Sequence, residues 1–393
     1  MPTDSPSVLA SSNSKRRIGL LSTYPPKLCG LATFSAALQA ELTRAGDRVD
    51  VVCIDDGHPS GERAPAGRAI LVNGSPASVL NTAAVLSRCD VAIVQHEYGI
   101  YGGVDGDEVL DLLAALDVPS IVILHTVPLS PTPHQKVVLE RVCALADRVV
   151  VMTGTAADRL LDLYDVNSAK VVLIPHGAAT APSGLPVDAR ETIVRRPQLL
   201  TWGLLGPGKG IEHVITAIAL LADLKPRVRY TVAGVTHPKV LARDGDQYRR
   251  SLIRRAWATG VASSVDFDDT YRDVAELTRF IASASVVVLP YDSRDQVTSG
   301  VLVDAIAAGR PVIATAFPHA VELLSGGAGI IVPHGDPVAL AAAIRSTVSD
   351  RGRLESMTAE ARRLAPSLKW STVAARYQRL CDDLVRIDQP VAT

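Results

Sequence analysis

The sequence contains no apolar run long enough to cross a membrane. A spanning helix needs ~20 consecutive, largely apolar residues, and no stretch of the 393 residues reaches that length. The first fourteen residues are polar and serine-rich, and they lack the apolar segment of a secretory signal. We therefore expect no integral membrane segment, a cytoplasmic location and a disordered N-terminus over residues 1–14.

Paired cysteines and clustered metal ligands are missing as well. The five cysteines stand singly and their number is odd, which argues against a disulfide framework or a cysteine-rich zinc site. The nine histidines show no spacing typical of metal ligands. Asp105-Gly106-Asp107 and Asp244-Gly245-Asp246 resemble a metal-binding carboxylate motif, but Asp-Gly pairs are typical of turns. We predict no required metal and no cofactor.

An excess of charge of either sign is also absent. Lysine and arginine number 40, against 41 aspartates and glutamates. A balance this close to neutral gives no general attraction to nucleic acid or to an anionic membrane. We expect no nucleic-acid partner. The composition leaves the oligomeric state open, with a homodimer as one option.

Short apolar, β-branched runs alternate with amphipathic stretches along the first half of the chain. The runs are nearly continuous in apolar residues, as expected of strands covered on both faces. Helical patterns such as Ala32 to Ala45 and Gln135 to Ala146 separate them. This alternation predicts an α/β fold with a parallel, doubly wound sheet. The predicted strands are Ile18 to Leu21, Val49 to Ile54, Val91 to Gln95, Ser120 to Leu124, Arg148 to Met152 and Lys170 to Ile174.

The same pattern restarts after a stretch rich in Pro, Gly and Ser, Ala179 to Pro197, which we interpret as a linker. Two Rossmann-like domains are therefore predicted, over residues 15–190 and 196–369. Ligands of such sheets bind at the carboxyl ends of the strands, which places a cleft between the domains. Further strands are predicted at Leu199 to Gly203, Arg229 to Ala233, Val265 to Phe267, Val286 to Leu289, Val312 to Ala314 and Gly329 to Val332. Further helices are predicted at Gly210 to Ala222, Tyr248 to Ala258, Val274 to Ala282, Gly300 to Ala308, Pro337 to Ser346 and Lys369 to Val385.

Five segments, in their order and spacing, resemble the retaining glycosyltransferases of family 4, which have the GT-B fold. The resemblance extends from about Arg17 to the C-terminus. It implies that residues 15–190 bind the acceptor and residues 196–369 the donor nucleotide. It also implies that a helix within 370–393 crosses back to the N-terminal domain. The segments are Pro25 to Phe34, Leu124-His125-Thr126, Ile174 to Gly177, Gly203 to Gly210 and Ser299 to Val312.

The last of these segments is the most informative. A strand ends at Pro290, a polar loop follows, and a helix opens at Thr298 or Ser299, either of which can cap it. The free N–H groups and partial positive charge of a helix N-terminus suit a diphosphate, and Gly300 lets the backbone come close. An ordinary capped helix is the alternative. We predict that Thr298, Ser299, Gly300 and Val301 bind the diphosphate of a donor.

In the family, this loop and helix carry two glutamates eight positions apart, one for the donor sugar and one for the ribose. The matching residues here are Gln296 and Asp304, so the chain resembles an atypical branch. Asp304 keeps a carboxylate that can accept ribose hydroxyl groups. Asp295 or Gln296 is expected to hold the sugar, and the sequence does not rank the two.

The glycine-rich loop containing Gly203 and Gly208 is expected to approach the phosphates. Its glycines permit close backbone approach, and Lys209 can stabilise the leaving diphosphate. A loop of this kind, taken alone, is more often a turn. The family has an arginine where this chain has Leu204. Positive charge at the phosphates is therefore expected from Lys209 and the helix, helped by Arg294.

On the N-terminal side, the resemblance implies contacts to the acceptor and to the transferred sugar. Gly30 lies in a loop that matches the family's double-glycine loop, with Cys29 in place of the first glycine. His125 matches a histidine that contacts the sugar, although a lone histidine after a strand can be structural. Glu322 matches an acidic residue beside the sugar, with a plain helix-opening role as the alternative. The acceptor cleft is expected to be lined by His96, Glu97 and Tyr98, and by His176, for which interdomain packing is an equal alternative.

The resemblance implies transfer of a hexose from a nucleoside diphosphate sugar to a hydroxyl group, with retention. Lys209, His125 and Asp295 or Gln296 are expected to carry it. A further likeness to actinomycete mannosyltransferases that build methylated mannose polysaccharides implies GDP-mannose and a soluble oligosaccharide or polysaccharide acceptor. UDP-glucose is the rival donor. A sugar-nucleotide epimerase, or a binding protein whose site has decayed, remains an alternative with the same fold.

Overall fold

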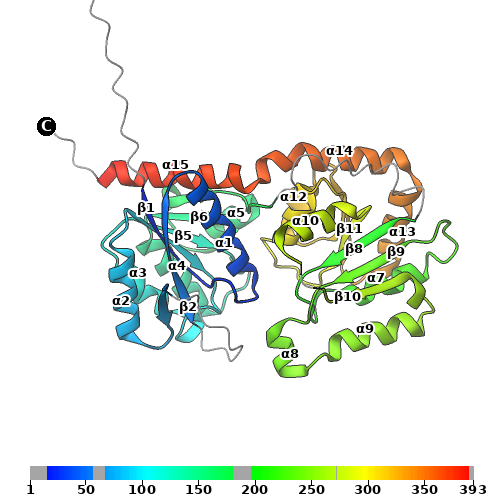
Figure 1. Ribbon diagram of the computed structural model, residues 1–393, viewed down its shortest axis with the longest axis horizontal. Helices are drawn as coiled ribbons and strands as arrows, with labels where there is room; N and C mark the ends of the chain where they lie inside the picture. Colours follow the sequence, from blue (N-terminus) through cyan, green and yellow to red (C-terminus); the bar gives the residue numbers. More distant parts are fainter. Residues whose placement is uncertain (1–15, 56–66, 180–195, 271, 389–393) are drawn as a thin grey trace, which may run out of the picture.

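Two parallel β-sheets form the framework of the protein (Figure 1). The computed structural model describes residues 16–55, 67–179, 196–270 and 272–388. The N-terminal sheet has the strand order β3-β2-β1-β4-β5-β6-β7, with the doubly wound arrangement in which the order reverses beside β1. Its strands are β1 (Arg17–Ser22), β2 (Arg48–Asp55), β3 (Ala69–Val72), β4 (Val91–His96), β5 (Ser120–Leu124), β6 (Arg148–Val151) and β7 (Val171–Leu173).

Helices cover both faces of this sheet because successive strand residues point to opposite sides. In β4, Ala92 and Val94 pack with helices α2 to α5, whereas Val91 and Ile93 pack with α1 and the C-terminal helix α15. The helices are α1 (Gly30–Arg44), α2 (Pro76–Leu86), α3 (Glu108–Ala114), α4 (Pro133–Leu145) and α5 (Gly154–Leu163), with short 3₁₀ turns at Val104–Gly106 and Ser168–Lys170.

The C-terminal sheet repeats the design with the strand order β10-β9-β8-β11-β12-β13. Helices α7, α9 and α13 pack on one face, and α10, α11, α12 and α14 pack on the other. The strands are β8 (Gln198–Trp202), β9 (Arg229–Ala233), β10 (Val265–Asp268), β11 (Val286–Leu289), β12 (Val312–Thr315) and β13 (Gly329–Val332). The helices are α7 (Ile211–Ala219), α8 (Pro238–Asp244), α9 (Gln247–Ala258), α10 (Val274–Ser283), α11 (Gly300–Ala307), α12 (Pro318–Leu324), α13 (Pro337–Ser349) and α14 (Arg351–Leu368), with a 3₁₀ turn at Ala262–Ser264.

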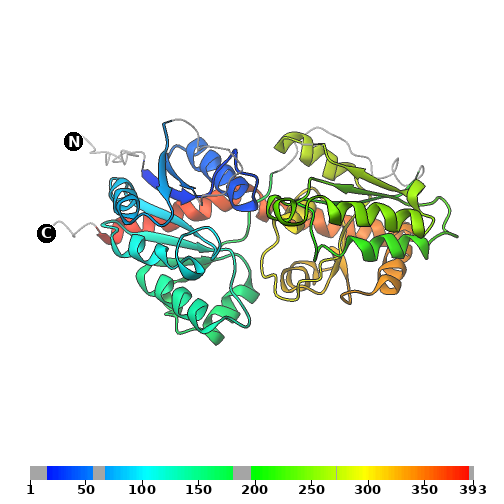
Figure 2. The same ribbon diagram turned by 90° about the horizontal axis from the view of Figure 1, so that it is seen from below.

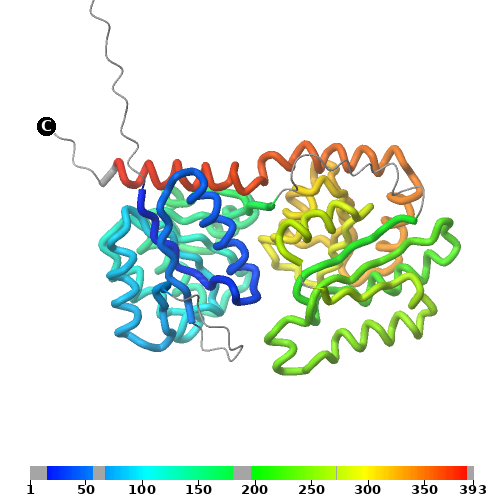
Figure 3. Tube along the Cα trace, viewed as in Figure 1, coloured from blue at the N-terminus to red at the C-terminus, as the bar shows by residue number. Residues whose placement is uncertain are grey.

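The last two helices join the domains. Figures 1 and 3 show α14 and α15 (Trp370–Asp388) running end to end across both, and Figure 2 shows the two domains side by side along these helices. Trp370, Val373 and Tyr377 of α15 are buried in the same cluster as Phe34 and Leu38 of α1. The C-terminal helix therefore completes the core of the N-terminal domain.

The predicted α/β fold with two doubly wound sheets is confirmed. Differences concern short or polar elements that the apolar pattern did not reveal: β3, α2, α3, α5, α8, α12 and α14. The first helix begins at Gly30 and not at Ala32, because the Cys29 sulfur accepts the Ala32 amide at 3.4 Å and caps it. Residues 1–14 and nearly all of the predicted linker lie outside the described residues. Among those described, no helix combines the length and apolarity needed to span a bilayer.

Candidate active site

The glycine-rich loop after β8 presents a lysine without an ionic partner. Lys209 is partly buried, its Nζ lies 4.5 Å from the ring centroid of Tyr291, and no described carboxylate pairs with it. Burial lowers the pKa of the Lys209 ammonium. Gly210 has φ 63°, and a Cβ there would lie 1.8 Å from the Pro290 oxygen, so only glycine lets the loop close over the end of β11. The loop therefore holds an unneutralised cation beside β11, as an anion site requires.

The opening of α11 lies next to this loop. Ser299 is the predicted cap: its hydroxyl accepts the Leu302 amide at 3.3 Å, and its own amide donates to His319 Nδ1 at 2.8 Å. The amides of Gly300 and Val301 have no acceptor among the described residues. A Cβ on Gly203 would lie 3.8 Å from Val301, which brings the two predicted phosphate-binding segments together. The free amides and the helix dipole face the same space as the lysine loop.

The structure separates the two candidates for the sugar-reading position. Asp295 is already engaged: one carboxylate oxygen pairs with Arg159 at 2.5 Å, and the other accepts the Leu129 amide at 3.3 Å. Gln296 donates its Nε2 to the Thr298 oxygen at 3.0 Å, while its own Oε1 accepts nothing among the described residues. Gln296 therefore keeps a free acceptor for a sugar hydroxyl, and Asp295 has the role of an interdomain contact.

Three more predicted donor residues lack partners in the described part of the chain. The Asp304 carboxylate, on the second turn of α11, makes no hydrogen bond or ion pair with the described residues, and burial raises its pKa to about 7. The Thr298 hydroxyl is buried and unbonded. Arg294 is exposed on the same loop. Unsatisfied buried polar groups are uncommon in folded proteins, so the buried, unbonded Thr298 hydroxyl at the opening of α11 points to a binding site.

On the N-terminal side, His125 lies in a rigid setting at the end of β5. Its Nε2 is 2.6 Å from Gln95 Oε1, and its ring packs edge-on against Phe34 at 5.1 Å between centroids. Burial lowers the pKa of His125 to about 3. His96, at the end of β4, is buried with both ring nitrogens unbonded, and burial lowers its pKa to about 4. Both rings are therefore neutral hydrogen-bonding groups at pH 7.

His176 packs at the boundary between the domains. Its ring lies 5.0 Å from Phe34 and 5.8 Å from Trp370, and its Nε2 would be 3.0 Å from a Cβ on Gly300. Burial lowers its pKa to about 4. The two roles left open for His176 coincide here, because the residue packs between the domains and also borders the opening of α11. Gly30, at the start of α1, has open space where a side chain would stand.

The predicted acceptor residues Glu97 and Tyr98 follow β4. Glu97 accepts the Thr126 hydroxyl at 2.5 Å, and burial raises its pKa. The Tyr98 hydroxyl donates to the Gln135 oxygen at 3.2 Å. Lys239 of α8 reaches this loop from the other domain, since its Nζ would lie 4.0 Å from a Cβ on Gly99. A carboxylate and an ammonium from opposite domains thus flank this region.

Glu322 contacts the N-terminus of a helix in the other domain. Its carboxylate accepts the amides of Gly154 and Thr155, each at 2.8 Å, and the Thr155 hydroxyl at 2.8 Å. It therefore caps α5 of the N-terminal domain from α12 of the C-terminal domain, and these bonds hold the pKa of Glu322 below its usual value. An acidic group is favourable at a helix N-terminus, and here it fastens one domain to the other.

Four residues that shape the site were not predicted. Tyr291 lies in the loop after β11, and His319 lies in α12, the helix that follows β12, so their position beyond strand ends was a usable signal. Gln95 is the polar last residue of a predicted apolar strand, so the same signal applied to it. Arg159 could have been identified from the sequence, because its spacing places it on the same buried helix face as Ala156 and Leu160. A charged residue on such a face requires a partner.

The buried histidines make stability depend on pH. His96, His125, His176 and His319 each bind a proton near pH 6.5 when unfolded but only near pH 4 or below when folded. As pH falls from about 6.5 to 4, the unfolded chain therefore gains more protons and the folded state loses stability. The Asp304 carboxyl opposes this loss of stability, because its pKa is higher in the folded protein than in the unfolded chain. Over much of the same pH range the folded state therefore binds one more proton at this group than the unfolded chain does.

We expect the melting temperature to be nearly constant above pH 7 and to fall towards pH 4. Each histidine contributes at most about 1.4 kcal/mol per pH unit. Thermal unfolding from pH 4 to 8 measures how steeply stability depends on pH. An unchanged slope in both His96→Phe and His319→Phe would contradict this account.

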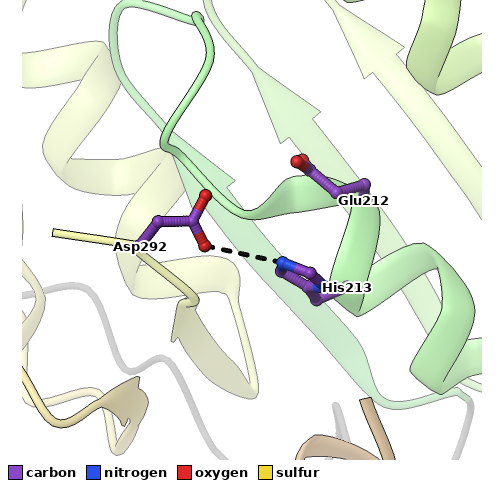
Figure 4. A group of neighbouring side chains, drawn as sticks. All are labelled: Glu212, His213 and Asp292. Atoms are coloured by element: carbon purple, nitrogen blue, oxygen red, sulfur yellow. Dashed lines mark ion pairs between the residues drawn. The ribbon is translucent and has the colours of Figure 1, made fainter. Parts of the chain in front are cut away.

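One group of side chains could hold a cation. Glu212, His213 and Asp292 each offer a ligand atom, all within 4.8 Å of one another. Figure 4 shows Asp292, in the loop after β11, facing His213 of α7, and their side chains lie 3.5 Å apart. Glu212 precedes His213 on α7 and also accepts the Tyr248 hydroxyl at 2.9 Å. The two rejected Asp-Gly-Asp segments lie in turns, with φ 50° at Asp105 and 60° at Gly245.

Both halves of the chain match known sequence families. Residues 29–182 match the model of Glycosyltransferase Family 4, and residues 196–350 match that of glycosyl transferases group 1. D-inositol 3-phosphate glycosyltransferase of Kineococcus radiotolerans is 29% identical over 319 residues, 68% of this chain and 67% of that protein. D-inositol 3-phosphate glycosyltransferase 1 of Catenulispora acidiphila is 31% identical over 263 residues, 63% and 60% of the two chains. The chain spans 54% to 67% of the length of such relatives.

Solved structures share the architecture. Sucrose-phosphate synthase from Thermosynechococcus elongatus superposes with a TM-score of 0.74 at 20% identity, covering 95% of this chain and all of that one. HepE from Anabaena, in complex with UDP, superposes with a TM-score of 0.72 at 17% identity, covering 94% and 100%. At these identities the likeness shows the fold: two parallel-sheet domains that face each other through the carboxyl ends of their strands.

Proposed function

Since this chain belongs to the glycosyltransferases of family 4 and group 1, with the GT-B fold, we propose that it transfers a hexose from a nucleoside diphosphate sugar to a hydroxyl group, with retention at the anomeric carbon. The observation that carries the proposal is the pairing of Lys209 with the open end of α11. An unpaired, partly buried ammonium and the free amides of Gly300 and Val301 converge there. Together they suit a diphosphate leaving group.

The chemistry follows from this placement. The bond between the anomeric carbon and the diphosphate oxygen breaks, and the electron pair leaves on the diphosphate. Lys209 and the α11 amides stabilise that charge as it develops. The acceptor hydroxyl forms the new bond on the same face of the sugar and passes its proton to the departing phosphate oxygen. The protein supplies position and charge, and no enzymic nucleophile takes part.

We assign substrate contacts to the remaining predicted residues from their polar groups and their positions in the two domains. Gln296 and the neutral His125 hold the sugar hydroxyls from opposite domains. Asp304 accepts from the ribose, and ligand binding there should favour its ionised form. Glu97 and Tyr98, on the N-terminal domain, border the acceptor. In this assignment the N-terminal domain borders the acceptor and the C-terminal domain binds the donor nucleotide, as the family resemblance implies.

For the donor we propose GDP-mannose and for the acceptor a soluble oligosaccharide or polysaccharide, on the likeness to actinomycete mannosyltransferases that build methylated mannose polysaccharides. UDP-glucose is the second candidate, supported by the UDP bound to HepE, whose fold this chain shares. The curated relatives are named for inositol 3-phosphate, so that acceptor belongs in the test. We place the enzyme in the cytoplasm, where nucleotide sugars are used.

A panel of GDP- and UDP-sugars, offered with short mannosides, glucosides and inositol 3-phosphate, tests the proposal. We expect GDP-mannose with a mannoside to give transfer, and the anomeric configuration of the product, read by NMR, to be that of the donor. Product formed without an acceptor would indicate an epimerase instead. Nucleotide binding without turnover of any donor would indicate a decayed site. Activity lost with EDTA would overturn the proposal that no metal is required and would point to Glu212, His213 and Asp292.

A further inference from the structure

A buried arginine of the N-terminal domain joins the two halves of the proposed site. Arg159 lies on α5, and its side chain is 7% exposed. Its Nη1 donates to the Val127 oxygen at 2.8 Å, in the loop that follows His125, and to the Asp295 oxygen at 3.1 Å, in the loop between β11 and α11. The same nitrogen pairs with the Asp295 carboxylate. One guanidinium thus contacts the segments that carry the two sugar-holding residues.

The β11–α11 loop is fastened to the N-terminal domain on both sides of Gln296. Before it, Asp295 bonds to Arg159 and accepts the Leu129 amide. After it, Val297 is 3% exposed within the hydrophobic cluster of the N-terminal domain, and its oxygen accepts the Thr153 hydroxyl at 3.0 Å. With both neighbours held against the other domain, the backbone of Gln296 has little freedom to shift. The diphosphate residues Lys209 and Ser299 make no contact with Arg159.

We propose that Arg159 is a positioning residue for sugar transfer, which holds the β11–α11 loop against the His125 loop so that Gln296 and His125 meet the same sugar. This inference rests on the proposed function. Arg159 itself touches neither the donor nor the acceptor in this arrangement. Its removal should therefore disturb the geometry of transfer while the nucleotide remains bound through Lys209 and α11.

The test compares Arg159→Ala with Arg159→Lys in the full chain. We expect Arg159→Ala to lower kcat on the order of 100-fold, the effect of misplacing a reacting group by ~1 Å. The Kd for GDP, and for UDP, measured by calorimetry should change less than about threefold, since the lost interaction acts in the transition state. Arg159→Lys should recover part of the rate, because an ammonium keeps the positive charge beside Asp295 but cannot reproduce the position of the Nη1 that also serves Val127.

Asp295→Ala completes a double-mutant cycle. If the pair acts as a unit, Arg159→Ala with Asp295→Ala together should be no slower than the worse single variant, within about twofold. Arg345→Ala is the matched control, because it removes an exposed arginine whose bonds to Asp223 are 2.7 and 2.8 Å long. Its kcat should equal that of the wild type. A wild-type kcat in folded Arg159→Ala, or losses that multiply in the cycle, would overturn the proposal.

Amide hydrogen exchange separates failure of this inference from failure of the proposed function. If the wild-type protein transfers no sugar, the proposed function is wrong, but the effect of Arg159 on the β11–α11 loop can still be measured. Exchange at residues 295–301 should be faster in Arg159→Ala than in the wild type, and unchanged in Arg345→Ala. Equal exchange in Arg159→Ala and the wild type would reject the positioning role whatever the activity.

Discussion

Replacing Lys209 by alanine should lower the rate of sugar transfer by on the order of 10²–10³, because a preorganised charge at the leaving group is removed. The ammonium has no ionic partner to leave behind, and its only ring contact is Tyr291 among the described residues. The variant should therefore fold normally. Steady-state kinetics with the preferred donor, and the Kd of the free nucleoside diphosphate, measure the effect on transfer and on binding separately.

A second lysine serves as the control for this variant. Lys225 is exposed in the loop before β9, and Lys225→Ala should retain wild-type kinetics. Lys209→Arg should keep part of the nucleotide affinity, since the charge remains although its geometry differs. Unchanged transfer by a correctly folded Lys209→Ala protein would show that the diphosphate lies elsewhere, and the assignment of α11 would fail with it.

Replacing Trp370 by alanine should cost about 3–5 kcal/mol of stability, as for large buried aromatic side chains in general. Its ring is 8% exposed and packs on Phe34 at 4.8 Å, while its amide donates to the Ala178 oxygen at 3.1 Å. Gly177 leaves room for the indole, since a Cβ there would lie 2.3 Å from the ring. Thermal and denaturant unfolding should show a melting temperature lower by roughly 10 °C.

The exposed Trp257 is the matched control. It is 73% exposed on α9, and Trp257→Ala should change stability by less than about 0.5 kcal/mol. Trp370→Phe should recover part of the loss, because a smaller ring still fills some of the space. Since Phe34 also packs on His125 and His176, Trp370→Ala should lower activity as well as stability. Equal stability losses at the two tryptophans would argue against α15 as part of the N-terminal core.

The elements predicted well are those whose signal is local. Strands such as β4 and β11 are largely continuous apolar runs. For α11 the sequence shows both ends of the helix: Ser299 caps its start, and Gly309 and Pro311 follow its end. Helix α14 was missed because it is largely polar and contains Pro366, which normally ends a helix. In the structure it survives because Ala361 and Leu368 bury its apolar side against the C-terminal domain.

The site divides in the same way. Lys209 and Ser299 could be predicted because each lies in a short segment with its own physical signature. The contact between Arg159 and Asp295 joins residues 136 positions apart, and Glu322 reaches α5 across 168. Nothing in the local pattern of an amphipathic helix says which distant group will meet it. Asp295 and Gln296 are neighbours of similar polarity, so only their tertiary partners distinguish them.

The position of α15 in the sequence affects the order in which the protein can mature on the ribosome. Phe34 and Leu38 of the N-terminal domain pack against residues from Trp370 onward. Roughly 200 residues separate Ile174 from Trp370, which at ~5–20 residues per second takes roughly 10–40 s to synthesise. During that interval one face of the first sheet is covered by α1 but lacks the part of its cover that α15 provides. The N-terminal domain therefore cannot finish folding ahead of the rest, and its open apolar face is available to chaperones until the last helix emerges.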